Sequence, residues 1–470
     1  MWLIILHIYF VSFIDKGVGS HLAIGERAIE QRAKWHIPID SLDYSVSTIY
    51  LDSLCRIGAD IKHTSRWFNG ATVEASAAMA DNIRLCSFVS NIELTRDTIS
   101  YPKRLHDKFR LERTSAENNA LNTVESQPQL DLFNLSPLHQ SGYEGQGIRM
   151  ALVDGTFYNA NSVALMDSVR ERGQLIGYRD FTDDDTDIFG STAEHGTACW
   201  STVAGLDSNY HGAATKAEYI LLRTEEALTE SPKEMDNWVA AVEYADSMGV
   251  NIISTSLGYY RFDSPAFNLA YSDLDGKTTR CARASLIAAR KGILIVTAAG
   301  NEGNKDWHYI TTPADADSIL TVGAVDNNGY LAGFSSRGPS SDNRVKPDVC
   351  AMGYTTCVVK AATGELTVKS GTSFACPLVA GMASSLWSAL PDADAMDIRE
   401  RILRSADRYD TPDNSYGYGI PDAWKAFTDS HTALMNNAVD KQGSCKYLEN
   451  GSIVIRIGDN RYNILGERIY

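Results

Sequence analysis

Five near-continuous apolar runs constrain the fold of this chain more than any other feature of its sequence. They are IRMALVD (148–154), AEYILLR (217–223), NIISTS (251–256), GILIVTAA (292–299) and ILTVGAV (319–325). Runs without polar alternation are typical of strands that are covered on both faces, as in parallel sheets. Between them lie stretches with helical periodicity, such as 235–248 and 282–291. This alternation predicts an α/β fold in which helices sandwich a parallel sheet.

The chain of 470 residues is too long for one ordinary core, so we expect several structural units. Residues 50–96 alternate between helical and strand-like segments and predict a small α+β domain. The polar stretch 114–130 is the best linker candidate, and the end of the chain predicts two or three short strands joined by turns. The predicted units are a signal peptide (1–20), a small α+β domain with its linker (21–125), the α/β domain (126–430) and a C-terminal tail (431–470).

The chain opens with an apolar run of twelve residues from Leu3 to Ile14. This run is too short to span a bilayer as a helix, and small residues follow it, as in secretory signal peptides. We therefore expect cleavage near Gly19 or Ser20 and a secreted or cell-envelope protein. An uncleaved anchor or a misplaced start codon remains an alternative, because no basic residue precedes the run. No other stretch approaches membrane-spanning length.

Charge and cysteine usage exclude some classes of protein. A net charge of −16 argues against a nucleic-acid partner, which would require a basic surface. The eight cysteines are scattered along a long chain, so they predict no small disulfide framework, and their pairing stays open. Cys199 and Cys376 lie in apolar helical segments and are expected to be buried thiols.

Five polar residues occupy positions where such a sheet would gather reactive groups. Asp154 ends one predicted strand, and Ser256 and Asn301 closely follow two others, while His195 and Ser373 open helical segments. Since the carboxyl ends of parallel strands meet at one edge, these side chains are expected to lie together. Taken singly, each has an ordinary interpretation as a strand-end acid, a helix cap or a turn residue.

Together these residues have complementary chemistry. A serine hydroxyl is a weak nucleophile, and the imidazole of His195 is a suitable base for Ser373 because its pKa lies near neutrality. A buried carboxylate such as Asp154 would hold the imidazole tautomer. The Asn301 amide and the Ser373 backbone N–H would donate to a developing oxyanion.

Four segments carry a resemblance to a known family: ALVDGTF around Asp154, EHGTACWSTVAG around His195, TAAGNEGN around Asn301 and SGTSFACPLVAG around Ser373. In sequence and in order they resemble the signature segments of the subtilisin-like serine proteases, and the likeness spans about 130–427. It implies a serine endopeptidase that hydrolyses proteins or peptides through an acyl-enzyme and requires no cofactor for catalysis. Asp154, His195 and Ser373 would form its triad, and Asn301 its oxyanion donor.

The resemblance also implies a substrate site and a zymogen. Ser256, Leu257 and Gly258 would pair with the substrate backbone, and Ala298, Ala299 and Gly300 would line the adjoining pocket. Tyr259 and Tyr260 would allow an aromatic wall, but the cleavage preference stays open. The unit at 21–125 resembles, more weakly, an inhibitory propeptide, with a permanent accessory domain as the alternative. The end of the chain faintly resembles tail segments of some exported bacterial proteins.

Some positions depart from the family pattern. Ala198 stands where many relatives have a second histidine, and Cys376 stands where threonine is more usual, which could make the enzyme sensitive to bulky thiol reagents. The stretch between Gly205 and Gly212 is shorter than the calcium loop of many relatives. The acidic stretches 183–187 and 272–279 are interpreted as turns rather than calcium loops. Structural calcium is therefore left open, and no metal ligand is predicted.

Two other functions compete with peptide hydrolysis. An inactive protease fold used for binding would not need all four catalytic residues, yet this sequence has all four. An esterase of the α/β-hydrolase type requires G-x-S-x-G with its histidine after the serine, whereas here Ala375 replaces the second glycine and His195 precedes Ser373.

Overall fold

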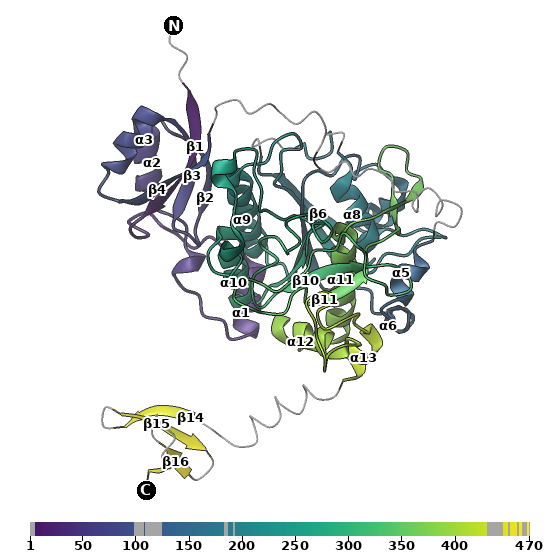
Figure 1. The fold of residues 1–470 in the computed structure, drawn as a ribbon. Coiled ribbons are helices and arrows are strands. Elements are labelled where there is room, and N and C mark those ends of the chain that lie inside the picture. Colours follow the sequence, from purple (N-terminus) through teal and green to yellow (C-terminus); the bar gives the residue numbers. More distant parts are fainter. Residues whose placement is uncertain are drawn as a thin grey trace.

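The computed structural model describes residues 5–97, 108, 125–182, 187–190 and 193–429, together with the backbone of four short strands in the C-terminal tail (Figure 1). A central sheet of seven strands forms the larger unit, in the order β11-β10-β9-β8-β5-β7-β6. Every neighbouring pair is parallel. The strands are β5 (Arg149–Asp154), β6 (Leu175–Asp180), β7 (Glu218–Arg223), β8 (Ile252–Thr255), β9 (Leu294–Ala298), β10 (Leu320–Val325) and β11 (Val349–Met352). The prediction of a parallel sheet is confirmed.

Helices cover both faces of this sheet, as predicted. Helices α8 (His195–Ala204) and α11 (Thr372–Ala389) pack on one face, and α9 (Pro232–Ser247) and α10 (Arg280–Arg290) on the other. Strand β5 shows why its apolar run is continuous. Met150 and Leu152 enter the core on the α11 side, while Ala151 and Val153 enter the core on the α9 side.

Shorter elements complete the larger unit. They are α5 (Gln127–Asp131), α6 (Ser136–Gln140), α7 (Asp167–Glu171), α12 (Ala395–Ser405), α13 (Ala423–Thr428) and the antiparallel pair β12 (Thr356–Val359) and β13 (Leu366–Lys369). Helix α5 corrects the linker prediction at its end. Leu130 is only 1% exposed and belongs to the core, so the linker does not extend to residue 130. In the tail, strands occupy Cys445–Glu449 (β14), Ser452–Ile457 (β15), Asn460–Tyr462 (β16) and Arg468–Ile469 (β17).

The N-terminal unit is a four-stranded antiparallel sheet with helices. Its elements are β1 (Leu6–Phe13), α1 (Glu26–Lys34), α2 (Thr48–Ile57), β2 (Asp60–Ser65), β3 (Gly70–Ser76), α3 (Ala77–Arg84) and β4 (Val89–Arg96). The strand order is β2-β3-β1-β4, and β1 pairs with both β3 and β4. Apart from α1, the sequence of elements and the strand order are those of a ferredoxin-like split βαβ unit.

Strand β1 corrects the predicted domain boundary at residue 20. The apolar run interpreted as a signal peptide lies inside the N-terminal sheet, where Tyr9, Val11 and Phe13 enter the core. Its β-branched and aromatic residues suit a strand that is paired on both edges. Cleavage near Gly19 or Ser20 would remove this strand from the domain. The N-terminal unit therefore begins with β1 rather than at residue 21.

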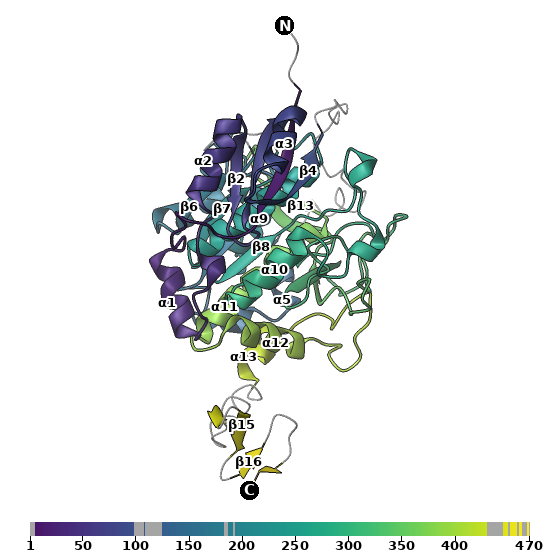
Figure 2. The same ribbon diagram turned by 90° about the vertical axis from the view of Figure 1, so that its left-hand side faces the viewer.

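The N-terminal unit packs on α9 and α10 of the larger unit (Figure 2). Buried ion pairs fasten the two together. Arg32 contacts Asp246 at 2.9 Å and Asp43 at 2.6 Å, and Arg66 also pairs with Asp246. Lys291 contacts Asp43 at 2.8 Å. Any other arrangement of the two units would leave a buried charge without its partner, so these ion pairs favour the arrangement seen here.

Among the described residues, no helix is both long and apolar enough to cross a membrane.

Candidate active site

A cavity of about 650 Å³ lies beyond the carboxyl ends of strands β7, β8 and β9. Three of the four predicted catalytic residues, His195, Asn301 and Ser373, line it. The remaining lining residues are Lys108, Glu225, Glu230, Ser256, Leu257, Gly258, Tyr260, Arg261, Phe262, Asp263, Ala298, Gly300, Glu302, Lys305, Thr311 and Thr372. The edge of the sheet predicted from the sequence is therefore the edge that carries the cavity.

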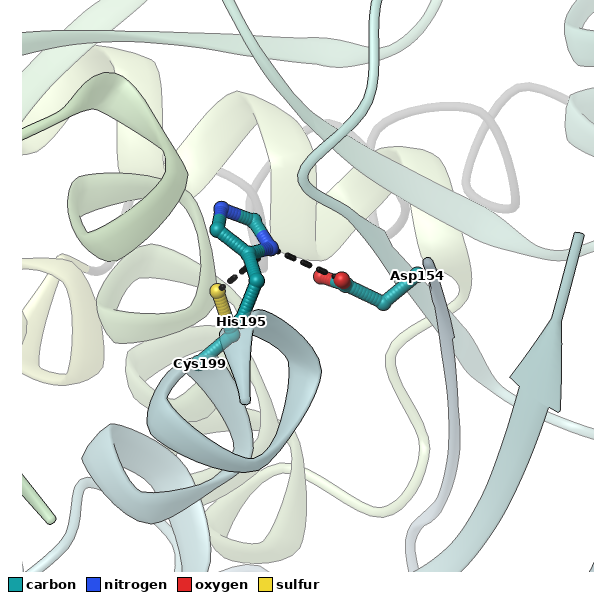
Figure 3. Close-up of side chains that lie close together, drawn as sticks. All are labelled: Asp154, His195 and Cys199. Carbon is teal, nitrogen blue, oxygen red and sulfur yellow. Dashed lines mark hydrogen bonds and ion pairs between the residues drawn. The ribbon is translucent and has the colours of Figure 1, made fainter. Parts of the chain in front are cut away.

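Asp154 and His195 form a buried hydrogen-bonded pair (Figure 3). The Asp154 Oδ1 atom lies 2.7 Å from His195 Nδ1, and the two residues are 2% and 6% exposed. An aspartate in this position fixes the tautomer that carries its proton on Nδ1 and leaves Nε2 as the basic nitrogen. Gly196 allows α8 to begin so close to β5, because a Cβ atom there would lie 2.4 Å from the Thr156 carbonyl oxygen.

Ser373 lies in the first turn of α11, close to this pair. The thiol of Cys199 donates to the Ser373 carbonyl at 3.3 Å, and its sulfur is 3.8 Å from His195 Nδ1. The Ser256 hydroxyl donates to the same carbonyl at 2.8 Å, and the ring centroids of Phe374 and His195 are 5.9 Å apart. The fold thus brings Asp154, His195 and Ser373, distant in the sequence, to one region, where His195 and Ser373 line the same cavity and the Ser373 hydroxyl donates to the Ser256 carbonyl at 3.5 Å.

Asn301 is fixed against the start of the same helix. Its Oδ1 atom accepts hydrogen bonds from the backbone N–H and the hydroxyl of Thr372, each at 3.0 Å. The Thr372 hydroxyl also accepts from the Gly300 N–H at 3.2 Å. Because Oδ1 is the acceptor, Nδ2 is the donor end of the Asn301 side chain, and Asn301 lines the same cavity as Ser373.

The predicted substrate-binding residues mostly line the cavity. Ser256, Leu257, Gly258, Ala298 and Gly300 do so. Ala299 does not. It is fully buried against Ile310 and Ala314, because successive residues of a strand point to opposite sides.

Cys199 is buried, as expected from the sequence, but its place in the candidate site was not predicted. Its thiol lies beside His195, whereas the buried Cys376 thiol donates to the carbonyls of Thr255 and Val296. Burial, and secondly the Asp154 carboxylate, raise the pKa of Cys199 well above its usual value, so the group is a neutral thiol. The helical spacing of His195 and Cys199, four residues apart, was the available signal. All seven cysteines whose side chains are described are free.

One side of the cavity is acidic, which sequence reasoning also missed. Glu225, Glu230 and Glu234 bring their carboxylates together, and Lys108 lies among them. The acidic stretch EEALTESPKE, directly after β7, was the available signal. Of the two tyrosines that the sequence suggested for an aromatic wall, Tyr260 lines the cavity and stacks on Trp307 with centroids 4.6 Å apart, whereas Tyr259 is buried and does not line it.

Two groups of three potential metal ligands occur among the described residues: Asp154 with His195 and Cys199, and the three glutamates. The first group is explained by the hydrogen bonds above. Asp187 accepts from the N–H groups of Phe189 and Gly190, and Asp275 from those of Lys277 and Thr278, so both stabilise their own turns. Asp183, Asp184 and Asp185 lie outside the described residues.

Comparison with known proteins identifies the family. The model of the subtilase family matches residues 10–419, most of the chain. The chain belongs to the subtilase family, a family of serine proteases. The residues matched by the family model include part of β1, in agreement with the place of that strand in the fold. Members of this family hydrolyse peptide bonds without a cofactor.

Curated relatives are 27% to 29% identical to this subtilase over the aligned residues. Subtilisin-like protease SBT6.1 of Arabidopsis thaliana is 29% identical over 57% of this chain and 24% of its own length. Serine protease AprX of Bacillus subtilis is 27% identical over 59% of this chain and 66% of its own length. Subtilisin DY of Bacillus licheniformis is 29% identical over 59% of this chain and 90% of its own length. The chain thus spans about a quarter of the first relative and two thirds of the second.

The crystal structure of MycP1 from the ESX-1 type VII secretion system has a similar fold. The TM-score is 0.51 at 20% identity, covering 66% of this chain and 88% of the other. This likeness confirms the fold class.

Proposed function

We propose that this subtilase is a serine endopeptidase that cleaves protein substrates through an acyl-enzyme. The observation that carries the proposal is the buried 2.7 Å contact between Asp154 and His195 in the cavity region that also contains Ser373 and Asn301. Ser373 attacks the carbonyl carbon, and His195 takes its proton and then gives it to the leaving amine. Water then attacks the acyl-enzyme by the same route and frees Ser373.

The remaining residues stabilise charge and position the substrate. Asp154 keeps the imidazole oriented and stabilises the imidazolium. The Asn301 amide and the Ser373 backbone N–H donate to the oxyanion, in a site where fixed donors need no reorganisation. Ser256 to Gly258 add the substrate to the protein as an extended strand.

Labelling by a fluorophosphonate probe, together with cleavage of casein, tests this proposal. We expect the purified full chain to be labelled and to cleave, and Ser373→Ala to do neither. We expect Asn301→Ala to lower kcat by about 10²- to 10³-fold, the size known for one oxyanion donor in subtilisin. A folded wild-type chain that is neither labelled nor active would support the rival function, a protease fold used only for binding.

We further propose that the N-terminal unit is an inhibitory propeptide. Its buried ion pairs with α9 and α10, and the presence of Lys108 in the cavity, support this role. Mass spectrometry of the wild type beside Ser373→Ala tests self-processing. If both chains begin at the same residue near 97–130, the unit is not removed by the enzyme itself.

Export stays a prediction without structural support. The expectation depended on residues 1–20, and strand β1 accounts for their apolar run. Fractionation of producing cells would test it.

A further inference from the structure

The acidic side of the cavity is an unusual concentration of buried charge. Glu225 and Glu230 lie in the loop between β7 and α9, and Glu234 lies in the first turn of α9. Their carboxylate oxygens lie within 4.8 Å of one another, and Glu225 and Glu234 are at most 1% exposed. Burial, and then the nearby Glu225 charge, raise the pKa of Glu234 well above its usual value. Three carboxylates in this setting require a cation.

Lys108 provides that cation from a distant part of the chain. Its Nζ atom donates hydrogen bonds to Glu225 at 2.7 Å and to Glu234 at 2.8 Å, and it forms an ion pair with Glu230 at 3.0 Å, so the ammonium group contacts all three carboxylates. The Lys108 side chain is only 7% exposed. Burial by itself lowers the pKa of Lys108, but the three carboxylates outweigh it and raise that pKa well above its usual value.

The backbone of Lys108 is held in the manner of a bound peptide. Its N–H donates to the Ala227 carbonyl at 2.9 Å, in the loop that carries Glu225 and Glu230. A main-chain hydrogen bond combined with a pocket for one side chain is how extended peptides are recognised along an exposed edge. Lys108, Glu225 and Glu230 line the same cavity as His195 and Ser373.

We propose that Glu225, Glu230 and Glu234 form a specificity pocket that selects a lysine side chain of protein substrates, and arginine less well, at a fixed distance from the cleaved bond. This inference rests on the proposed endopeptidase function. Three acceptors that converge on one point suit the three donors of an ammonium group better than the planar fork of a guanidinium. Lys108 is the internal occupant of the pocket, and a substrate lysine would make the same contacts in its place.

Cleavage-site profiling on a set of denatured proteins tests the proposal, with each enzyme form first titrated by the fluorophosphonate. The full-length wild type and Lys108→Met are profiled together, so that the internal lysine does not mask a preference. We expect lysine to be enriched at one position relative to the cleaved bonds. Replacing that lysine by norleucine in a fluorogenic peptide keeps the apolar stem and removes the ammonium, and should lower kcat/KM at least about tenfold.

Three variants locate the preference. Glu230→Gln and Glu225→Gln should each reduce the ratio of kcat/KM between the lysine and norleucine peptides. Glu226→Gln is the matched control and should leave the ratio unchanged, because Glu226 pairs with Lys233 and Arg96 rather than with Lys108.

The outcomes separate this inference from the proposed function. An enzyme that is labelled and cleaves casein without a lysine preference, or a preference unchanged in Glu230→Gln and Glu225→Gln, would overturn the pocket but leave the endopeptidase. Cleavage could instead depend on added Ca²⁺ in a way that these glutamates determine, with no dependence on lysine. That result would also overturn the pocket, because the glutamates would then form a cation site. Absence of both labelling and cleavage would overturn the proposed function and the pocket with it.

Discussion

Replacing Thr372 by Val removes part of the link between Asn301 and the helix that carries Ser373. Val has nearly the same shape, and Thr372 is fully buried, so packing is preserved. Two of three hydrogen bonds are lost: the hydroxyl to Asn301 Oδ1 at 3.0 Å and the Gly300 N–H to the hydroxyl at 3.2 Å. The Thr372 N–H still donates to Asn301. Each net hydrogen bond contributes about 1 kcal/mol, so the interactions that hold the Asn301 amide in place weaken by about 1 to 2 kcal/mol.

That loss corresponds to about 5- to 30-fold in kcat, below the effect expected for Asn301→Ala. The effect should fall on kcat rather than on KM, because the oxyanion forms only in the transition state. Kinetics on a peptide substrate, normalised to fluorophosphonate-labelled enzyme, would measure it. In the double variant with Asn301→Ala, the Thr372 substitution should add almost nothing. If the two losses multiply instead, Thr372 does not act through Asn301 and the reasoning fails.

Three other predictions follow from individual contacts. Mercuric ion should inactivate the wild type and Cys376→Ala but not Cys199→Ala, because of these two sulfurs it is that of Cys199 that lies beside His195. Equal sensitivity of all three forms would contradict this. Burial raises the pKa of Asp236 to about 6, so ionisation costs the folded state about 3 kcal/mol and stability falls as pH rises from about 4 to 6. In a Ser373→Ala background, the melting temperature of Asp236→Asn relative to its parent should therefore rise between pH 4 and 8, and a constant difference would refute the shift. Gly258→Ala should raise KM, since its Cβ would lie 2.0 Å from the Thr311 hydroxyl, and Thr311→Ala should partly restore binding; no rescue would exclude that clash.

The central sheet, and the place of the candidate site residues at its edge, could be predicted because their signals are local. Strands that are covered on both faces need continuous apolar runs. Because the strands are parallel, their carboxyl ends all lie at the same edge of the sheet. The positions of Asp154, His195, Asn301 and Ser373 follow from that topology together with their motifs. Ala299 was misplaced because a motif does not show which of two successive residues faces the cavity.

The acidic pocket and strand β1 could not be predicted in this way. Lys108 stands 117 residues before Glu225, and no pattern in the sequence links them. The run that contains β1 has the length and composition of a signal peptide as well as those of a buried strand. Only its pairing with β3 and β4 distinguishes the two, and pairing partners distant in sequence leave no local signal.

The order in which β1 acquires its neighbours matters during synthesis. Val11 leaves the ribosome before both of the residues with which it pairs, Ala71 and Ile92. The nascent chain therefore carries an unpaired apolar ribbon until both later strands have emerged, and such ribbons favour aggregation. For the same reason, loss of β1 would remove an inner strand of the small sheet rather than a border strand.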